Sequence, residues 1–393
     1  MNETLLKTDI QAFINANIGT DITKLALQKN PFPEADWREI LNQIVAKTKA
    51  KDKLPTWFQT DEILYPAKIS VEQTSSEKTA LYKSKIVSGE NLIDLTGGFG
   101  VDDYYFAKNV KNVFHCEING ELSAIVKSNF EKLNVRNIEC LAGDSSAILK
   151  NQQTTFDWIY IDPSRRNDAK GKVFLLKDCL PNVPELLDFY LQKSPNILIK
   201  TAPILDINAG LTELKYVKNI HIVAVDNEVK ELLWDISKFY IGAVTIKTVN
   251  ILKDSEETFD FILGRNDELI TFGLPKKYLF EPNAAIMKSG GFDEIGLMFG
   301  FEKLHPFSHL YTSETIVDFP GRIFEIHNQI PYSKNEMKAF LENQKANITT
   351  RNFPDSVEVI RKKWKIKDGG NQYCFFTTAA NQNKIVLICS KIK

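Results

Sequence analysis

A glycine-rich stretch from Asn91 to Asp103, NLIDLTGGFGVDD, restricts the possible folds more than any other part of the chain. In it, a short apolar run carrying Asp94 breaks into closely spaced glycines, and a helix-compatible segment begins at Val101. The pattern predicts a buried parallel strand that turns sharply into a helix. Gly98 and Gly100 allow positive φ angles and a close approach of the backbone to a ligand, and Asp94 at the strand end can accept hydrogen bonds.

Three further apolar runs follow, and a carboxylate stands at the end of each: Glu117, Asp144 and Asp162. Ligands of open α/β sheets bind at the carboxyl ends of the strands, so we expect the four acids to meet at one edge. Glu117 lies about 20 residues beyond the glycines, where an acid can hold both hydroxyls of a ribose. Taken singly, each acid also fits a helix N-cap or a turn, above all Asp144 before Ser145.

A nicotinamide-dinucleotide domain is the main alternative for such a turn. Its fingerprint places a third glycine near position 103, where this chain has Asp103. Further strands are expected at 196–201 and 221–225, and the β-rich runs 243–252 and 258–263 suit an antiparallel hairpin at the end of the sheet. Because nicotinamide domains usually lack that hairpin, the pattern disfavours the alternative.

The glycine turn and the strand-end acids together resemble the class I S-adenosylmethionine-dependent methyltransferases over roughly residues 91–264. The resemblance implies an α/β fold with a Rossmann-like seven-stranded sheet and S-adenosyl-L-methionine as the cofactor. It implies that the loop after Asp94 holds the methionine moiety, Glu117 the ribose and Asp144 the adenine amino group. The cofactor-binding residues that it implies are Asp94, Thr96, Gly97, Gly98, Phe99, Gly100, Glu117, Ile118, Asp144, Ser145 and Asp162. Thr96 departs from the family, whose loop often begins with glycine.

The turn after the fourth strand reads Asp162-Pro163-Ser164-Arg165-Arg166 and would line the site of methyl transfer. Methyltransferases of exocyclic amines that resemble this family place a second proline and an aromatic residue after the acid, and this chain has neither. Carbon-5 methylation of pyrimidines needs a cysteine nucleophile, and the nearest downstream, Cys179, is expected inside a helix. The two arginines suit a substrate phosphate, or else an ion pair with a local acid.

Lys200 and Glu228 follow the next two predicted strands and could converge with Asp162. Such an acid-lysine-acid set could deprotonate a hydroxyl, or it could be a structural ion pair. The predicted catalytic residues are Asp162, Pro163, Ser164, Arg165 and Lys200. No His/Cys cluster has the spacing of metal ligands, so we expect no metal site.

The regions around the predicted sheet differ in character. Residues 1–88 read as helical, and Ser75-Ser76 suits the N-cap of a helix that lies over the cofactor end of the sheet or simply packs on it. Short apolar runs and turn signals after Pro275 indicate a small α+β module. We predict a helical N-terminal domain at 1–88, a methyltransferase domain at 89–274, a ferredoxin-like module at 275–325 and a basic domain at 326–393.

The last 63 residues, from Pro331 onward, carry twelve bases and five acids, whereas the remainder carries 37 bases and 45 acids. A basic domain on an acidic body most simply meets a polyanion. The tail, with Arg351-Asn352-Phe353-Pro354 and Lys367-Asp368-Gly369-Gly370, resembles the THUMP-like domain, and the whole chain resembles the class I methyltransferases that carry it. THUMP domains proper bind RNA, so the resemblance implies a structured RNA, tRNA or rRNA, as the substrate.

A run of cations within the tail is predicted to contact RNA phosphates. Its members are Arg361, Lys362, Lys363, Lys365 and Lys367. Trp364 within this run could stack on a base, or at helical spacing it could point into the core.

Five cysteines without a CxxC pair indicate reduced thiols, and no stretch reaches the about 18 apolar residues of a membrane span. We therefore expect a cytoplasmic protein that is neither secreted nor membrane-spanning. Three hypotheses for its function remain open. They are an S-adenosylmethionine-dependent RNA methyltransferase, an RNA-binding protein with a catalytically idle methyltransferase fold, and a methyltransferase acting on protein or a small molecule.

Overall fold

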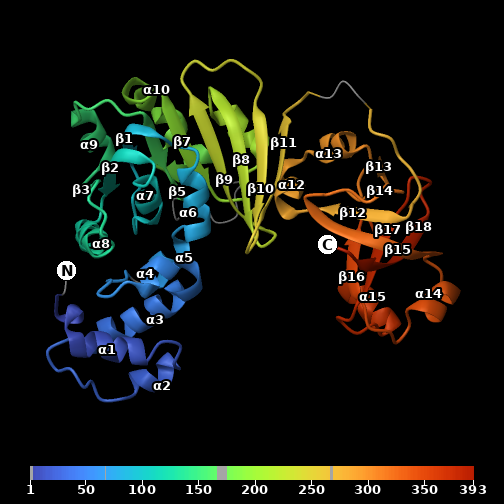
Figure 1. The fold of residues 1–393 in the computed structure, drawn as a ribbon, viewed down its shortest axis with the longest axis horizontal. Helices are drawn as coiled ribbons and strands as arrows, with labels where there is room; N and C mark the ends of the chain where they lie inside the picture. Colours follow the sequence, from blue (N-terminus) through green and yellow to red (C-terminus); the bar gives the residue numbers. More distant parts are fainter. Residues whose placement is uncertain (1–2, 67, 166–174, 266–268) are drawn as a thin grey trace. The chain divides into compact units, whose positions relative to one another are not determined.

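The computed structural model of the protein describes residues 3–66, 68–165, 175–265 and 269–393, with the backbone alone for 68–70 and 165. The chain forms two compact units, each described by itself (Figure 1). The first comprises Met1–Asn219 and Lys230–Gly242, and the second Ile220–Val229 and Ala243–Lys393.

The first unit begins with helices, as predicted. They are the 3-10 helix η1 (Glu3–Leu6), α1 (Thr8–Ala16), α2 (Ile22–Ala26), α3 (Trp37–Lys53), α4 (Pro55–Gln59), α5 (Lys68–Gln73) and α6 (Glu77–Ser84). Apolar residues at helical spacing on α1 and α3, including Ile10, Ile14, Ile40 and Ile44, bury each other in one cluster. Ser76 caps α6, accepting a hydrogen bond from Thr79 N at 3.2 Å, as its position before the helix predicted.

The central sheet contains nine strands rather than the seven predicted. They are β1 (Gly89–Asp94), β2 (Val110–Glu117), β3 (Ile138–Ala142), β4 (Trp158–Ile161), β7 (Asn196–Thr201), β8 (Val217–Val225), β9 (Glu228–Ser237), β10 (Thr245–Ile251) and β11 (Glu256–Ile262). Their order is β11-β10-β8-β9-β7-β4-β1-β2-β3. The pairs β1–β2, β1–β4, β2–β3 and β4–β7 are parallel, so the strand-end acids share one edge.

The strand missed by the sequence analysis is β9, which pairs antiparallel with β7. Charged residues in its first half, such as Lys230 and Glu231, hide the strand pattern, although Leu232 to Ile236 are all buried. A two-residue connection, Asp226-Asn227, joins β8 to β9, and both residues have positive φ angles of 50° and 64°. Such a connection is typical of a tight hairpin. The predicted hairpin farther along the chain is confirmed as the antiparallel pair β10–β11.

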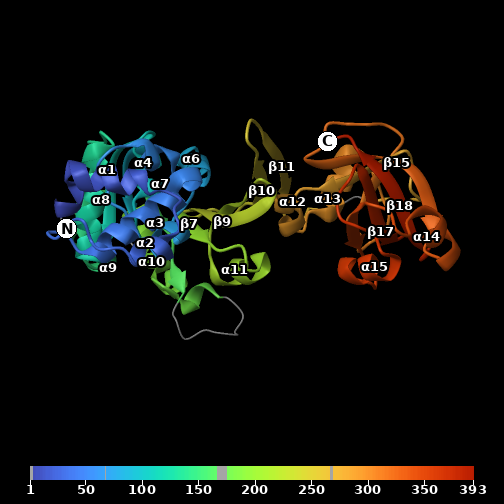
Figure 2. The same ribbon diagram turned by 90° about the horizontal axis from the view of Figure 1, so that it is seen from below.

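Helices cover the parallel strands on both sides. They are α7 (Val101–Phe106), α8 (Gly120–Lys132), α9 (Ser145–Asn151), α10 (Val183–Lys193) and α11 (Ile207–Glu213). Figure 2 shows α6, α7 and α8 on one face of the sheet and α9, α10 and α11 on the other. The sheet with its two helical layers is the Rossmann-like architecture that the family resemblance implied.

The single helix expected around residues 175–190 is wrong. The chain forms a 3-10 helix η2 (Leu176–Asp178) and a short strand β6 (Cys179–Leu180) before α10. Pro181, which cannot continue a helix, separates β6 from α10. The strand β6 pairs with β5 (Ser164–Arg165), directly after the Asp162-Pro163 turn.

The second unit is built on a seven-stranded sheet of order β13-β14-β12-β15-β18-β17-β16. Its elements after β11 are β12 (Tyr278–Pro282), α12 (Ala284–Ser289), α13 (Phe292–Phe299), β13 (Glu302–Lys303), β14 (Tyr311–Ser313), β15 (Gly321–Pro331), α14 (Lys334–Phe340), β16 (Asn347–Arg351), α15 (Val357–Trp364), β17 (Gln372–Thr378) and β18 (Lys384–Lys391). The tail follows the predicted order of helix, strand, helix and two strands. The expected boundary between residues 325 and 326 falls within β15, which pairs with both β12 and β18.

All five cysteines are free thiols, and four of them are buried. Within the described ranges, no helix is both long and apolar enough to cross a membrane.

Candidate functional site

The glycine turn after β1 is formed by three glycines with different tasks. Gly98 and Gly100 have positive φ angles of 57° and 76°, as predicted. A Cβ at Gly97 would lie 2.2 Å from the His115 ring, and one at Gly100 would lie 2.5 Å from Phe130. A Cβ at Gly98 would meet open space apart from Thr96 O at 3.7 Å. Gly97 and Gly100 therefore allow close packing, whereas Gly98 leaves the outer side of the turn accessible.

Thr96 connects the ends of β1 and β4. Asp94 accepts hydrogen bonds from Thr96 N at 2.7 Å and from Thr96 Oγ1 at 3.0 Å. The same hydroxyl oxygen accepts a hydrogen bond from Asp162 N at 2.7 Å. This double use of one hydroxyl explains a threonine where the family often has glycine. Asp94 is only 1% exposed, so its carboxylate holds the loop rather than facing solvent, and its predicted role in cofactor binding stays a prediction.

Glu117, at the end of β2, stands against the open side of the turn. Its Oε2 accepts a hydrogen bond from Gly98 N at 3.0 Å, and its Oε1 accepts one from Asn119 N at 2.7 Å. The carboxylate is half-exposed and keeps lone pairs for further donors. Ile118, the next residue, leaves 77% of its surface exposed, which gives an apolar face beside the acid.

Asp144 has the structural role that its sequence context also allowed. It is the N-cap of α9, and its Oδ1 accepts a hydrogen bond from Ala147 N at 2.8 Å. The side chain is exposed and Oδ2 remains available, while Ser145 behind it is half-buried. Capping and ligand binding are therefore compatible at this position.

The turn after β4 brings two predicted catalytic residues together, because Asp162 and Lys200 form an ion pair. Burial opposes the charge on Lys200, but Asp162, Asp102 and Glu231 together raise its pKa. Lys200 is therefore a cation at neutral pH and is unsuited to act as a base. Glu228, the third member expected of this set, belongs to the other compact unit, and its role stays a prediction.

The rest of this turn is partly outside the described residues. Pro163 is buried and Ser164 is exposed. The side chain of Arg165 and the whole of Arg166 lie outside the described residues. Cys179 lies in β6 beside this turn rather than in a helix, but it is fully buried, so its thiol does not face a substrate.

A buried network of charged residues lies below the glycine turn, and the sequence analysis missed it. Lys83 of α6 is fully buried, with its Nζ 3.0 Å from Asp102 Oδ1 and 2.9 Å from Glu231 Oε2. Asp102 Oδ2 also accepts hydrogen bonds from Ser75 Oγ and Tyr160 OH, both at 2.8 Å. The network therefore joins the N-terminal helices, the helix after the glycine turn and the strand β9.

A second buried pair lies next to this network. His115 Nδ1 is 2.6 Å from Asp103 Oδ2, and both side chains are fully buried. Burial lowers the pKa of His115, and burial together with the charge of Asp102 raises the pKa of Asp103. Burial and Asp103 likewise raise the pKa of Asp94. These shifts favour neutral forms directly under the turn.

One signal in the sequence points to this network. Asp102 and Asp103 follow the last glycine of the turn and open α7, a position where acids commonly interact with the helix dipole. Their burial was not foreseeable from that role. Lys83 and Glu231 lie 148 residues apart, and no local pattern in a single sequence pairs them.

The predicted RNA-binding cations lie on and after α15 in the second unit. Lys362, Lys363, Lys365 and Lys367 are exposed, whereas Arg361 is half-buried and pairs with Asp368. Trp364 is 6% exposed and packs in the core of this domain. Its indole therefore offers no free face for a base, and of the two interpretations left open, burial in the core is confirmed.

Among the described residues, no group of three or more His, Cys, Asp or Glu side chains could hold a metal ion.

The sheet has parallel strands, an antiparallel strand β9 beside β7, and a glycine turn at the carboxyl edge of the parallel strands. This combination is that of a methyltransferase fold. A THUMP domain-like family matches residues 321–391, and a ferredoxin-like domain matches residues 278–320. The crystal structure of a candidate methyltransferase from Porphyromonas gingivalis W83 is similar over 100% of this chain and 99% of that chain, with 30% identity and a TM-score of 0.90. The chain belongs to the family of that protein, the class I methyltransferases with a C-terminal THUMP-like domain.

A curated relative from Mycoplasma mobile is named an uncharacterized RNA methyltransferase. It is 30% identical over 171 residues, which cover 41% of this chain and 45% of the relative. The match thus spans less than half of the relative's length. Together these findings confirm the resemblance predicted from the sequence.

Proposed function

We propose that the protein transfers a methyl group from S-adenosyl-L-methionine to a structured RNA, tRNA or rRNA, that its basic C-terminal domain holds. The observation that carries this proposal is the pairing of Glu117 with Gly98 N. It places a carboxylate suited to ribose hydroxyls against the open face of the glycine turn.

The residues at this edge fit the cofactor. Open space outside Gly98 admits the methionine moiety, and the half-exposed Glu117 keeps acceptors for the ribose. The exposed Ile118 supplies an apolar surface for the adenine, and Asp144 Oδ2 an acceptor for its amino group. The cofactor supplies an electrophilic methyl group on a sulfonium.

The chain's own residues then align and shield the reaction. Methyl transfer from a sulfonium disperses positive charge, so alignment and exclusion of water contribute more than strong acid-base chemistry. Lys200 fixes the carboxylate of Asp162 beside the transfer site, and Thr96 fixes the backbone of the same residue. A substrate proton would then be accepted by Asp162, because Lys200 is protonated. Pro163 and Ser164 complete the wall of this site.

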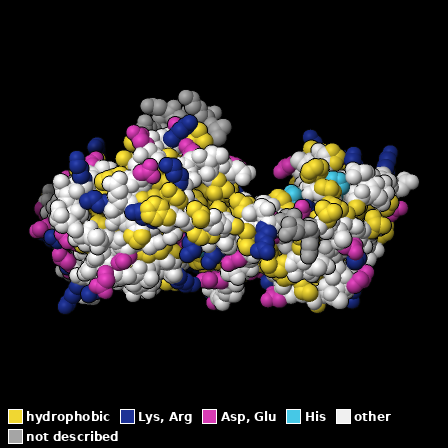
Figure 3. Space-filling view, turned by 90° about the horizontal axis from the view of Figure 1, so that it is seen from above, with side chains coloured by type: hydrophobic (Ala, Val, Ile, Leu, Met, Phe, Trp, Pro, Cys, Tyr) yellow, Lys and Arg dark blue, Asp and Glu magenta, His cyan; other side chains and the backbone are white. Residues whose placement is uncertain are grey.

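Substrate capture is assigned to the C-terminal domain. The four exposed lysines of the predicted set, from Lys362 to Lys367, can contact phosphates. Figure 3 shows one face of the molecule, on which basic and acidic side chains are interspersed. That face therefore has no continuous basic surface for RNA among the described residues. The named activity of the Mycoplasma mobile relative also supports an RNA substrate. Free buried thiols agree with a cytoplasmic location.

Calorimetric titration with S-adenosylmethionine and, separately, NAD tests the cofactor. We expect binding of S-adenosylmethionine alone, and a loss of about tenfold or more in the Glu117→Ala variant, because hydrogen bonds to charged groups contribute about 1.5–3 kcal/mol. Glu121→Ala on the exposed start of α8 is the matched control and should bind normally. Equal affinity in both variants would contradict the assigned role of Glu117.

Transfer of a radiolabelled methyl group to total RNA, to protein and to a metabolite extract tests the substrate. Incorporation into RNA supports the proposal. Cofactor binding with incorporation only into protein or a metabolite would favour the third hypothesis, and RNA binding without cofactor binding would favour the idle fold.

A further inference from the structure

Two surface pockets of the C-terminal domain share one lining residue, Tyr332. One pocket, of about 430 Å³, lies between α14 and α15 and is lined by three lysines. The other, of about 560 Å³, lies between the end of β15 and the turn from β17 to β18 and is lined by four Asn and Gln residues, of which Gln382 pairs with His305. Of the residues that line the two pockets, the sequence analysis predicted an RNA contact only for Lys363.

The lysine pocket carries excess positive charge. Lys334 and Lys338 are spaced by four residues on α14, are exposed, and form no ion pair within the part of the chain that the structure describes. Lys363 of α15 lies over the Tyr332 ring, 5.2 Å from its centroid, with its Nζ 3.2 Å from the hydroxyl. Glu342 is the one acid among the described lining residues. Three cations around one hollow suit a phosphate group.

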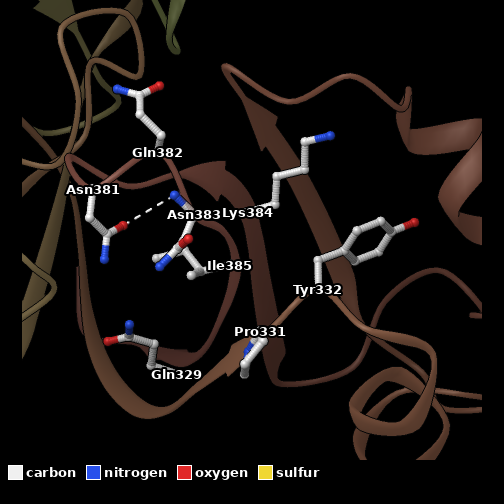
Figure 4. Close-up of a pocket in the computed structure, with 8 residues that line it drawn as sticks. All are labelled: Gln329, Pro331, Tyr332, Asn381, Gln382, Asn383, Lys384 and Ile385. Carbon is white, nitrogen blue, oxygen red and sulfur yellow. Dashed lines mark hydrogen bonds between the residues drawn. The ribbon is translucent and has the colours of Figure 1, made fainter.

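The amide pocket offers the groups that read a nucleobase edge. A carboxamide presents two donors and an acceptor, the pattern that pairs with bases. Figure 4 shows Asn381, Asn383 and Gln329 on one side of Pro331 and Tyr332 on the other. The backbone N of Asn383 donates to Asn381 Oδ1 at 3.1 Å, whereas the side-chain amides of Asn383 and Gln329 have no partner among the described residues.

Tyr332 is fixed between the two pockets. Its hydroxyl donates a hydrogen bond to Asp355 at 2.9 Å, and its ring packs edge-on against Phe353 and Phe376. The residue is half-buried and lines both pockets. A cationic pocket and an amide pocket that meet at one anchored residue suit the two unlike ends of a nucleotide.

We propose that these two pockets form one binding site for an unpaired ribonucleotide segment, with a phosphate among the lysines and a base among the amides. Unpaired nucleotides are favoured because in A-form duplexes the bases are stacked and side chains cannot read the deep, narrow major groove. The inference rests on the proposed RNA substrate and names the part of the RNA that this domain holds.

The test measures fluorescence anisotropy of the full chain with a labelled single-stranded RNA oligonucleotide and with the corresponding duplex. We expect tighter binding of the single strand. Lys334→Ala/Lys338→Ala should weaken binding about fivefold or more and lower the slope of log affinity against log salt by about 0.7, the share of one phosphate contact on a single strand. Asn383→Ala should reduce affinity without changing the salt slope, because an amide carries no charge.

The matched control is Lys24→Ala/Lys29→Ala, which removes the same charge from exposed positions near α2 in the first unit. It should bind as the unaltered protein does. If the unaltered protein binds RNA and the pocket variants bind it equally well, the inference is overturned, whereas the proposed function still stands. If the unaltered protein binds S-adenosylmethionine but neither RNA, the RNA substrate itself is refuted.

Discussion

The hydroxyl of Thr96 holds two strand ends in register, and its loss should be measurable. It donates to Asp94 and accepts from Asp162 N, in a part-buried setting. Thr96→Ala should cost about 1–3 kcal/mol of stability, the range for leaving a buried polar group unsatisfied. It should also weaken binding of S-adenosylmethionine, because the turn and the Asp162 backbone lose their common support.

Thr96→Ser is the control, since it keeps the hydroxyl and removes only a methyl group. Urea unfolding and calorimetric titration should place Thr96→Ser close to the unaltered protein and Thr96→Ala well below it. If both variants fall equally far below the unaltered protein, the methyl group rather than the hydroxyl is what the site requires, and if neither falls, the hydroxyl has no such role.

The buried imidazole of His221 in β8 should make the stability depend on pH. Burial, with a smaller effect of Lys247, lowers the pKa of His221 to about 3. Between about pH 3 and the ordinary value near 6.5, the unfolded state binds a proton that the folded state does not. Stability therefore falls as the pH drops below about 6.5, by up to about 1.4 kcal/mol per pH unit.

His221→Gln removes this contribution. Urea unfolding at pH 7 and pH 5 should show that the unaltered protein loses about 2 kcal/mol more than the variant over that interval. Equal losses would mean that His221 takes up a proton in the folded state as readily as in the unfolded state.

The glycine turn is an element whose sequence predicted both its shape and its place. Gly98 and Gly100 share positive φ angles but differ in their surroundings. Gly98→Ala should cost about 1–2 kcal/mol for the left-handed backbone alone. Gly100→Ala should cost about 1–3 kcal/mol more, because its Cβ would lie 2.5 Å from Phe130 and 2.9 Å from Val126. Thermal unfolding of the two variants decides the matter, and similar melting temperatures would exclude the packing role of Gly100.

Helices and strands with a regular apolar pattern could be predicted from the sequence. Elements whose pattern is interrupted by charged residues that pair only in the folded chain could not. The runs that became β1, β2 and β7 are apolar because both faces of a parallel strand are buried. In β9 the charged Glu231 is buried because Lys83 pairs with it, so the strand reads as polar. Cys179 looked helical because its leucine neighbours have helical spacing, but Pro181 ends that pattern.

The candidate site shows the same division. Glu117 was found because its distance from the glycines is set locally by one helix. Its hydrogen bond to Gly98 N follows from the parallel pairing of β1 and β2. Lys83, Asp102 and Glu231 come from three separate segments, and only the folded chain brings them together.

At the scale of the whole chain, Lys83 ties the N-terminal helices of the first unit to its sheet. The lysine is fully buried between Asp102 and Glu231, and burial raises the pKa of Glu231 even with Lys83 beside it. Lys83→Met would remove the cation that lies within 3.0 Å of both carboxylates and would leave Lys200 to compensate them from farther away. Breaking a buried pair in this way costs about 3–5 kcal/mol. The N-terminal region would loosen with it, and binding of S-adenosylmethionine should weaken because Asp102 opens the helix after the glycine turn.

Two further variants separate the charge effect from simple loss of packing. Lys83→Met/Glu231→Gln removes one buried charge of each sign and should recover part of the stability, giving a coupling free energy of about 1–3 kcal/mol in a double-mutant cycle. Lys111→Met breaks an ion pair with Glu90 of similar length, 2.8 Å, between exposed side chains, and should cost at most about 1 kcal/mol. Urea unfolding measures all of them. If Lys83→Met lowers the free energy of unfolding no more than Lys111→Met does, the N-terminal helices are held by their apolar contacts alone.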